Sequence, residues 1–273
     1  MLVSSHQDKI MTQHPCFNDS AHNRIGRVHL PIAPRCNIQC NFCVHNFCAA
    51  LIFQHPGWSA KLMSVTESVD LIRSITRFKG STVFVVGIAG PGDPLANNQT
   101  FEALDRIHKE HPHLIKCMST NGLLLEDKLE DIINVGISAL TITINAADKK
   151  TGETIYSWIN YKGIVYYGEE AANILLSKQL KGMNKAAQAG LSIKVNTVYI
   201  PGTNDFQMSK LANLIKKAGA KKMNIMPLIP AGNMINKPRP SCSELIKARQ
   251  ICERIIPQFN YCEQCRSDII YFP

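Results

Sequence analysis

Six short β-rich runs, each followed by a helical pattern, constrain the fold of this chain more than any other feature of its sequence. Parallel strands need long, usually helical, crossover connections, whereas antiparallel neighbours can be joined by tight turns. A regular βα series therefore predicts an α/β fold with a parallel sheet. The predicted strands are 27–33, 82–90, 114–120, 139–145, 192–200 and 222–229, and the predicted helices are 66–78, 100–110, 126–134, 168–190, 206–218 and 242–256.

The strand candidates are nearly continuous in Val, Ile and Leu, which is typical of strands buried on both faces in a barrel or a doubly wound sheet. The pattern alone does not decide between these two folds. In both, ligands bind at the carboxyl ends of the strands. Polar residues and glycines gather at those ends, and they are our candidate ligand-site residues: Gly90, Pro91, Gly92, Asp93, Ser119, Thr120, Asn121, Asn145, Asn196 and Pro227.

The length of 273 residues suits one α/β barrel, so we expect a single domain over 1–273. Its core is expected at about 27–240, with extensions at 1–26 and 241–273. The hydrophobic fraction of 45% is ordinary for a globular protein, and no apolar run reaches the roughly 18 residues that a membrane helix needs. We therefore expect a soluble protein without a membrane partner.

The formal net charge of +9 raises the question of nucleic-acid binding. Lysines and arginines are spread thinly, however, and no nucleic-acid-binding motif is present, so we expect no such partner. The N-terminal segment is polar and lacks the apolar stretch of a secretory signal, which favours a reducing, cytoplasmic environment. In that environment the ten cysteines are more often metal ligands than disulfides.

Cys36, Cys40 and Cys43 form the spacing CxxxCxxC after the first predicted strand, and Cys48 follows five residues later. The four could form one four-ligand metal site, two disulfides, or a three-ligand site with one separate cysteine. Three thiolates in one loop can bind three irons of a [4Fe-4S] cluster and leave the fourth iron open to an exogenous ligand. We favour this arrangement, with Cys36, Cys40 and Cys43 as the catalytic metal ligands.

This motif at the end of the first strand of a βα series resembles the radical S-adenosylmethionine (SAM) superfamily, in which the open iron binds SAM. Phe42 precedes the third cysteine, where that superfamily usually has an aromatic residue. The segment GIAGPGDPL (87–95) is similar to the glycine-rich segment that holds the SAM amino group. The resemblance implies a [4Fe-4S] cluster and SAM as cofactors.

Further segments, in the same order along the chain, resemble the NifB family of nitrogenase cofactor biosynthesis proteins. They are HPCF (14–17), HLPIAPRCNIQCNFC (29–43), AGPGDPLAN (89–97), STNG (119–122), TITINA (141–146), IPGTND (200–205), NIMPLIPAG (224–232) and CEQCRSD (262–268). The resemblance implies a partial TIM-like (β/α)6 radical SAM barrel with N- and C-terminal extensions. It is closest to the short form of the family, which lacks a NifX-like domain.

The NifB resemblance also implies a reaction. Two further [4Fe-4S] clusters are substrates, and they are fused with a SAM-derived carbide and an added sulfur into an eight-iron precursor of the nitrogenase cofactor. One SAM donates a methyl group to a cluster sulfide, and a second SAM yields the radical that abstracts a hydrogen from that methyl. The implied partners are iron–sulfur donor proteins, a reductant protein and a downstream cofactor carrier, and the chain is expected to be a monomer.

The family pattern assigns the remaining cysteines. Cys16, Cys262 and Cys265 are expected to bind one substrate cluster, and Cys48 and Cys117 the other. A nitrogen ligand is expected from His22 or His29, although His29 on a strand could equally be a core histidine; for Cys117, at a strand end, a small core residue is the alternative to the expected ligand role. Cys242 and Cys252, in the last helical pattern, are expected to bind no metal.

The chain departs from the NifB pattern after Cys48. The family has a segment close to VNESRPGV there, with a glutamate thought to help hold a substrate cluster, whereas this chain reads AALIFQHPGWSA (49–60). The tail likewise reads CRSDIIYFP (265–273) in place of CRADAxG. Two alternatives therefore stay open: a radical SAM enzyme with one auxiliary cluster that acts on a small molecule or peptide, and a non-catalytic iron–sulfur scaffold or carrier.

Overall fold

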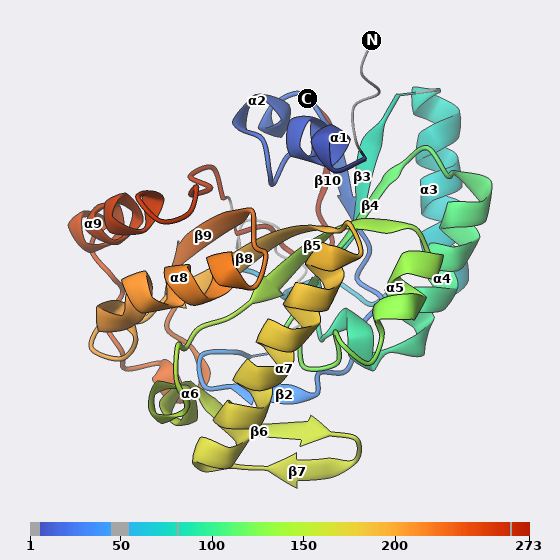
Figure 1. The fold of residues 1–273 in the computed structure, drawn as a ribbon. Helices are drawn as coiled ribbons and strands as arrows, with labels where there is room; N and C mark the ends of the chain where they lie inside the picture. The colour runs from blue at the N-terminus through green and yellow to red at the C-terminus, as the bar shows by residue number, and fades with distance from the viewer. Residues whose placement is uncertain (1–5, 45–54, 81, 263) are drawn as a thin grey trace.

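The computed structural model describes residues 6–44, 55–80, 82–262 and 264–273. Its main feature is a curled sheet with the strand order β10-β1-β3-β4-β5-β8-β9 (Figure 1). All neighbours from β1 to β9 are parallel, and only β10 pairs antiparallel, with β1. The strands are β1 (Gly26–His29), β3 (Phe84–Ile88), β4 (Ile115–Thr120), β5 (Ile137–Thr143), β8 (Ser192–Tyr199), β9 (Lys222–Pro227) and β10 (Ile270–Tyr271).

The parallel strands follow one another in chain order, and this decides between the two folds that the sequence left open. A doubly wound sheet reverses its strand order at a switch point, whereas this sheet never does. Crossovers of one hand then place every connecting helix on the same face, and the sheet curls away from them. The expected partial TIM-like (β/α)6 barrel is confirmed.

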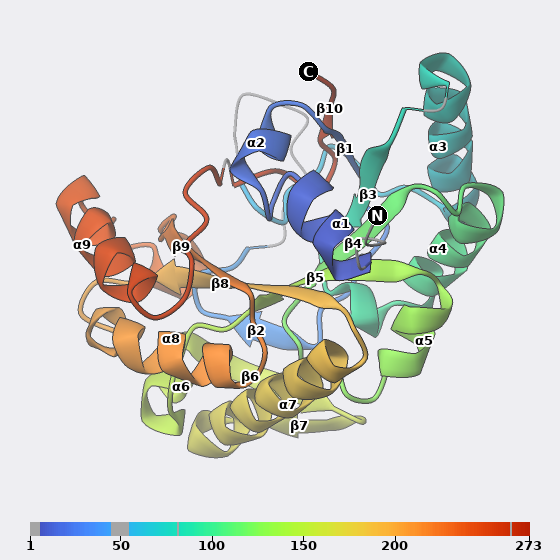
Figure 2. The same cartoon turned by 45° about the horizontal axis from the view of Figure 1, so that its top comes forward.

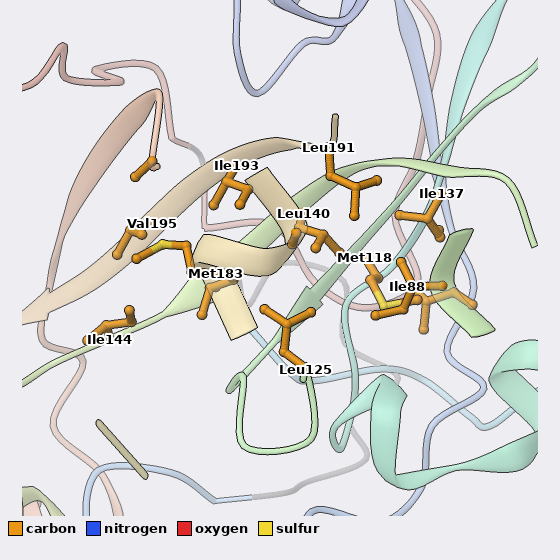
Figure 3. Close-up of a cluster of buried hydrophobic side chains, with 14 of the residues drawn as sticks. Ile88, Met118, Leu125, Ile137, Leu140, Ile144, Met183, Leu191, Ile193 and Val195 are labelled. Atoms are coloured by element: carbon orange, nitrogen blue, oxygen red, sulfur yellow. The ribbon is translucent and has the colours of Figure 1, made fainter. Parts of the chain in front are cut away.

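Helices cover the convex face of this half-barrel and bury a continuous apolar core (Figures 1 and 2). Figure 3 shows Ile88, Met118, Leu140 and Ile193 of four neighbouring strands in this core, together with Met183 of the helix α7. Serines at 64 and 241 form capping boxes that start α3 and α9. The covering helices are α3 (Val65–Lys79), α4 (Asn98–Glu110), α5 (Leu129–Asn134), α7 (Gly168–Gln188), α8 (Met208–Lys217) and α9 (Cys242–Glu253).

The six predicted strands and six predicted helices are all present, with ends shifted by a few residues. The first strand stops at His29 instead of residue 33, because Pro31 and Pro34 have no N–H to donate to a neighbouring strand. A second, antiparallel sheet was not predicted: β2 (Ile38–Cys40), β6 (Tyr156–Tyr161) and β7 (Ile164–Tyr166). Three short helices were also missed: α1 (His6–Gln13), α2 (Asp19–His22) and α6 (Lys149–Ile155).

The two chain ends pack against the concave face and the edges of the sheet. Helix α1 and the segment after it cover the amino ends of the strands, where Ile10 and Phe17 bury Val85, Ile115 and Ala139. The C-terminal segment runs along both edges: the Phe259 N–H donates to the Met223 carbonyl at 2.7 Å, and the His29 N–H donates to the Ile269 carbonyl at 2.8 Å. The N-terminal extension thereby brings Cys16 against the inside of the half-barrel.

Spanning a bilayer takes a long and uniformly apolar helix, and the described ranges contain none.

Candidate active site

The CxxxCxxC loop follows the carboxyl end of β1, and its shape depends on the small second sheet. Cys40 ends the three-residue strand β2, which pairs with β6 through Ile38 and Ile159. The Cys43 N–H donates to the Cys40 carbonyl at 3.0 Å, which turns the chain back after the strand. The Gln39 side chain donates to the carbonyls of Cys40 and Cys43 at 2.9 and 3.0 Å. These hydrogen bonds fix the loop through its backbone carbonyls, so the thiols remain available as ligands.

The three thiols share one apolar environment. Cys36 and Cys40 are partly buried against the cluster that contains Ile38, Tyr156 and Ile159. Burial raises the pKa of Cys36 to about 12 and that of Cys43 to about 11. The pKa of Cys40 is raised well above its usual value, first by burial and then by the charges of Cys43 and Cys36. A cationic centre is therefore needed to hold all three as thiolates.

A buried amide donor beside the loop also fits a bound cluster with SAM. The Asn121 amide donates to Asn37 Oδ1 at 2.7 Å and lies 3.7 Å from Cys36 Sγ. The Nδ2 of Asn37 is buried and finds no acceptor among the described residues. Such a donor suits a cluster sulfide or a carboxylate of a bound ligand. Neither Asn37 nor its pairing with Asn121 could be foreseen from the cysteine spacing.

No group of three or more His, Cys, Asp or Glu side chains in the described ranges is arranged to hold a single metal ion. A [4Fe-4S] cluster makes a different demand, since each of its cysteines binds a different iron. The ligands of a cluster are consequently spread further apart than those around one ion. The three thiols of the loop, with their shared burial and mutual repulsion, fit the cluster and its open iron.

The glycine-rich segment at the end of β3 holds the chain immediately before Cys36. The Gly92 N–H donates to the Ala33 carbonyl at 2.6 Å, and the Asp93 N–H donates to the Arg35 carbonyl at 2.9 Å. The Asn97 amide donates to the same Arg35 carbonyl at 2.7 Å. A Cβ at Gly92 would overlap that carbonyl, so only glycine permits the approach.

Asp93 links the ends of β3 and β4. Its carboxylate is buried and accepts from the Thr120 hydroxyl at 2.8 Å, the Asn121 N–H at 2.6 Å and the Leu95 N–H at 2.9 Å. Burial raises the pKa of Asp93, and these hydrogen bonds oppose that rise. Because Asp93 is occupied by protein donors, its observed contacts position Asn121 and the cysteine loop.

The other candidate residues at strand ends have different surroundings. Asn145, after β5, is fully buried and accepts from the Val198 N–H at 2.9 Å, which ties β5 to β8. Asn196 is half-buried, and its side-chain oxygen accepts from the Asn224 amide at 3.0 Å. The Pro227 carbonyl accepts from the Gln264 amide at 3.2 Å. Gln264 lies between Cys262 and Cys265, so that contact holds the segment with these two cysteines at the end of β9.

A second donor set lies on the concave face, on three neighbouring strands. His29 of β1 pairs with Gly87 of β3, and Gly87 pairs with Cys117 of β4. A Cβ at Gly87 would lie 3.3 Å from His29 Nε2 and 3.2 Å from Cys117 Sγ. The imidazole and the thiol therefore face the same point above Gly87, and because a Cβ there would also lie only 2.9 Å from His29 Cδ2, glycine leaves the room that these two side chains need.

His29 presents an unprotonated nitrogen to that point. Its Nδ1 lies 3.0 Å from the Arg266 carbonyl, which can only accept, so Nδ1 carries the proton and Nε2 has a free lone pair. Burial lowers the pKa of His29, which keeps the ring neutral. A neutral imidazole with a free Nε2 is a competent metal ligand.

Cys16 reaches this donor set from the N-terminal extension. Cys16 and Cys117 pack against the same buried cluster, and burial raises the pKa of Cys117, with a further rise from the Cys16 thiol. His22, the other candidate nitrogen ligand, lies beside the ring of Phe259 at 5.8 Å between centroids, with its Nδ1 3.1 Å from the Pro15 carbonyl. Of the two histidines, the structure places His29 next to Cys117.

The remaining cysteines divide as follows. Cys262 packs against the same apolar cluster as Cys36 and Cys40, and Cys265 is partly buried. Cys252 is buried in the outer core, and Cys242 is exposed at the start of α9. Cys48 lies outside the described residues.

Residues 55–60 are the described part of the segment that departs from the family pattern after Cys48. They contact the C-terminal tail, 265–273, which also departs from that pattern. The Ser267 N–H donates to the Trp58 carbonyl at 2.8 Å, and the Ala60 N–H donates to Asp268 Oδ2 at 2.5 Å. The Ser267 hydroxyl also donates to the Ala89 carbonyl at 3.1 Å, next to Gly90. The two segments that depart from the family pattern are thus hydrogen-bonded to each other beside the glycine-rich segment.

Comparison with known proteins extends these observations. The radical SAM superfamily matches residues 30–215. The chain is 41% identical over 261 residues to the FeMo cofactor biosynthesis protein NifB of Methanocaldococcus infernus, which covers 96% of this chain and 86% of that protein. It is 39% identical to the protein of the same name from Klebsiella pneumoniae, over 94% of this chain and 56% of the longer relative.

Solved structures share the fold. Streptococcus suis SuiB aligns with a TM-score of 0.61 over 89% of this chain and 51% of SuiB, at 12% identity. Methylornithine synthase (PylB) aligns with a TM-score of 0.53 over 93% of this chain and 68% of PylB, at 15% identity. At these identities the likeness supports the barrel alone.

The contacts of Asp93 generate a prediction. Asp93→Asn keeps the side-chain volume but replaces one of the two acceptor oxygens with an NH2 group, which cannot accept a hydrogen bond from Thr120, Asn121 or Leu95. We expect the free energy of unfolding of the metal-free protein to fall by about 1–3 kcal/mol in urea titrations. Asp105→Asn, on the exposed surface of α4, is the matched control and should change it by less than about 0.5 kcal/mol. Equal effects of the two substitutions would contradict the positioning role of Asp93.

Proposed function

Because the chain belongs to the NifB family and is therefore a radical SAM enzyme of FeMo cofactor biosynthesis, we propose that it builds the eight-iron precursor of that cofactor. In this proposal two [4Fe-4S] clusters are its substrates, and they are fused with a SAM-derived carbide and one added sulfur. The observation that supports it most is the donor set of His29 and Cys117 above Gly87, on the concave face and apart from the CxxxCxxC loop.

Cys36, Cys40 and Cys43 would hold the cofactor cluster, which supplies the electron for reductive cleavage of SAM at its open iron. The other residues of this site position the cysteine loop. Gly92 donates to the Ala33 carbonyl and Asn97 to the Arg35 carbonyl, and Asn121 directs its amide at Asn37 and Cys36. The strand-end residues Gly90, Pro91, Ser119, Thr120 and Asn196 are proposed to line the SAM site next to this loop.

The two substrate clusters would be bound side by side. We assign Cys117, with His29 and Cys48, to one of them, and Cys16, Cys262 and Cys265 to the other. The electrostatic contact between Cys16 and Cys117 supports this, because fusion requires the two substrates to be neighbours. Ligands that bind a cluster weakly also suit a substrate that must leave the enzyme as part of a larger product.

The surroundings of the enzyme are part of the same proposal. Residues 1–273 would act as one catalytic domain in the reducing cytoplasm, as a monomer. Substrate clusters would arrive from iron–sulfur donor proteins, electrons from a reductant protein, and the product would pass to a cofactor carrier.

Iron counting after anaerobic reconstitution tests the number of clusters. We expect about 12 iron atoms per chain, because three four-iron clusters are bound. Replacing Cys36, Cys40 and Cys43 by Ala should remove about four, and Cys117→Ala should lower the content of the substrate sites. Cys242→Ala, which changes an exposed cysteine, is the control and should lose none. A total of about four iron atoms in the parent protein would contradict the proposal.

Product analysis tests the reaction. With dithionite and SAM, the loaded protein should form both 5′-deoxyadenosine and S-adenosylhomocysteine, since one SAM is cleaved and another gives up its methyl group. The triple variant of Cys36, Cys40 and Cys43 should form no 5′-deoxyadenosine. Formation of 5′-deoxyadenosine without S-adenosylhomocysteine would point to a radical SAM enzyme of another kind, and the absence of both would point to a scaffold or carrier.

A further inference from the structure

Lys194 is a buried cation inside the half-barrel. Its neighbours Ile193 and Val195 face the helix-covered core (Figure 3), so the alternation of strand residues directs Lys194 to the concave face. There it lies in register with Thr141 of β5 and Lys222 of β9. The residue is only 3% exposed.

The ammonium group of Lys194 has no charge partner in the described part of the chain. Its Nζ lies 4.9 Å from the centroid of the Phe259 ring, and it makes no hydrogen bond or ion pair with a described residue. A cation–π contact of this kind compensates only part of the cost of burial. Lysine is rarely buried to this extent without an anionic partner.

Nearby carboxylates are committed to other cations. Asp19 lies 3.9 Å from Lys222, and Asp268 is paired with Arg266 at 2.9 Å. Lys194 lies near the substrate site across the strands, because its register partner Thr141 on β5 pairs with Ser119, two residues beyond Cys117 on β4. After burial, which is the main cause, the Lys194 charge contributes to the lowered pKa of His14 and His29, and it opposes the burial that raises the pKa of Cys117.

We propose that Lys194 is the positioning residue that balances the negative charge of the iron–sulfur substrate bound at Cys117 and His29, an inference that rests on the proposed function. A cluster bound by thiolates is an anion in a site of low dielectric, where one nearby positive charge has a large effect. The bound anionic substrate thus gives the Lys194 ammonium a charge partner, and the ammonium balances part of the negative charge of the substrate. Lys194 also discriminates between substrates, because a neutral ligand would leave its charge unpaired.

The test counts iron at the substrate sites alone. The background is the Cys36→Ala, Cys40→Ala, Cys43→Ala protein, reconstituted anaerobically, into which Lys194→Met, Lys194→Arg or Lys222→Met is introduced. Retained iron is measured against increasing chelator, and the reduction potential of the bound cluster is measured by a titration followed by electron paramagnetic resonance. Thermal unfolding of each metal-free protein reports whether the fold is intact.

Lys194→Met should retain iron about tenfold less strongly, and its cluster should have a more negative reduction potential, because a nearby positive charge is lost. The metal-free variant should unfold at the same temperature or about 2–4 °C higher, since an unpaired buried charge has been removed. Lys194→Arg keeps the charge and should restore both iron retention and potential. Lys222→Met is the matched control, and it should change neither because its charge is already balanced by Asp19.

Two results would overturn the inference. If Lys194→Met holds iron as strongly as its parent with an unchanged potential, or if Lys222→Met loses as much, the charge of Lys194 has no specific role. If the parent triple variant itself binds no iron, the substrate sites do not exist, and the proposed function fails together with the inference. The two failures are distinguished by the iron content of the parent.

Discussion

The site depends on the hydrogen bonds by which the segment after β3 holds the chain that precedes Cys36. Three thiols can serve one cluster only if their loop keeps a single shape, and the contacts within the loop, from Gln39 and between Cys43 and Cys40, do not reach the chain before Cys36. The necessary contacts come from outside, where Gly92, Asp93 and Asn97 bind the carbonyls of Ala33 and Arg35. Asp93 then extends the same network to β4 through Thr120 and Asn121. The ends of three adjacent strands thereby act as one rigid support.

The alternation of side chains along the strands gives the half-barrel two faces with different chemistry. On the convex face, Ile193, Val195 and Met118 form a dry core with the helices. On the concave face, the intervening positions carry Cys117 and Lys194. A closed barrel would fill this interior with apolar side chains. Here the sheet stays open, and the N-terminal extension supplies Cys16 and His14 to the interior instead.

Much of the fold could be predicted from the sequence, because each strand and helix of the half-barrel carries its own periodicity and its own boundary residues. The second sheet could not, since β2 has three residues and its partner β6 lies more than a hundred positions later in the chain. The same limit applies to the site. The loop cysteines were marked by their spacing, whereas the choice between His22 and His29 needed the register of β1 with β3. The buried amides of Asn37 and Gln179 follow no spacing rule, and only their hydrogen bonds to or from Asn121 reveal them.

The central claim is that iron binds at two separate places, the CxxxCxxC loop and the concave face beside Cys117. Anomalous diffraction at the iron edge, from anaerobic crystals of the reconstituted protein, locates iron directly. Our account predicts a strong iron peak at Cys36, Cys40 and Cys43, and further iron above Gly87 between His29 Nε2 and Cys117 Sγ. Iron confined to the CxxxCxxC loop, with Cys117 and His29 unliganded, would contradict it.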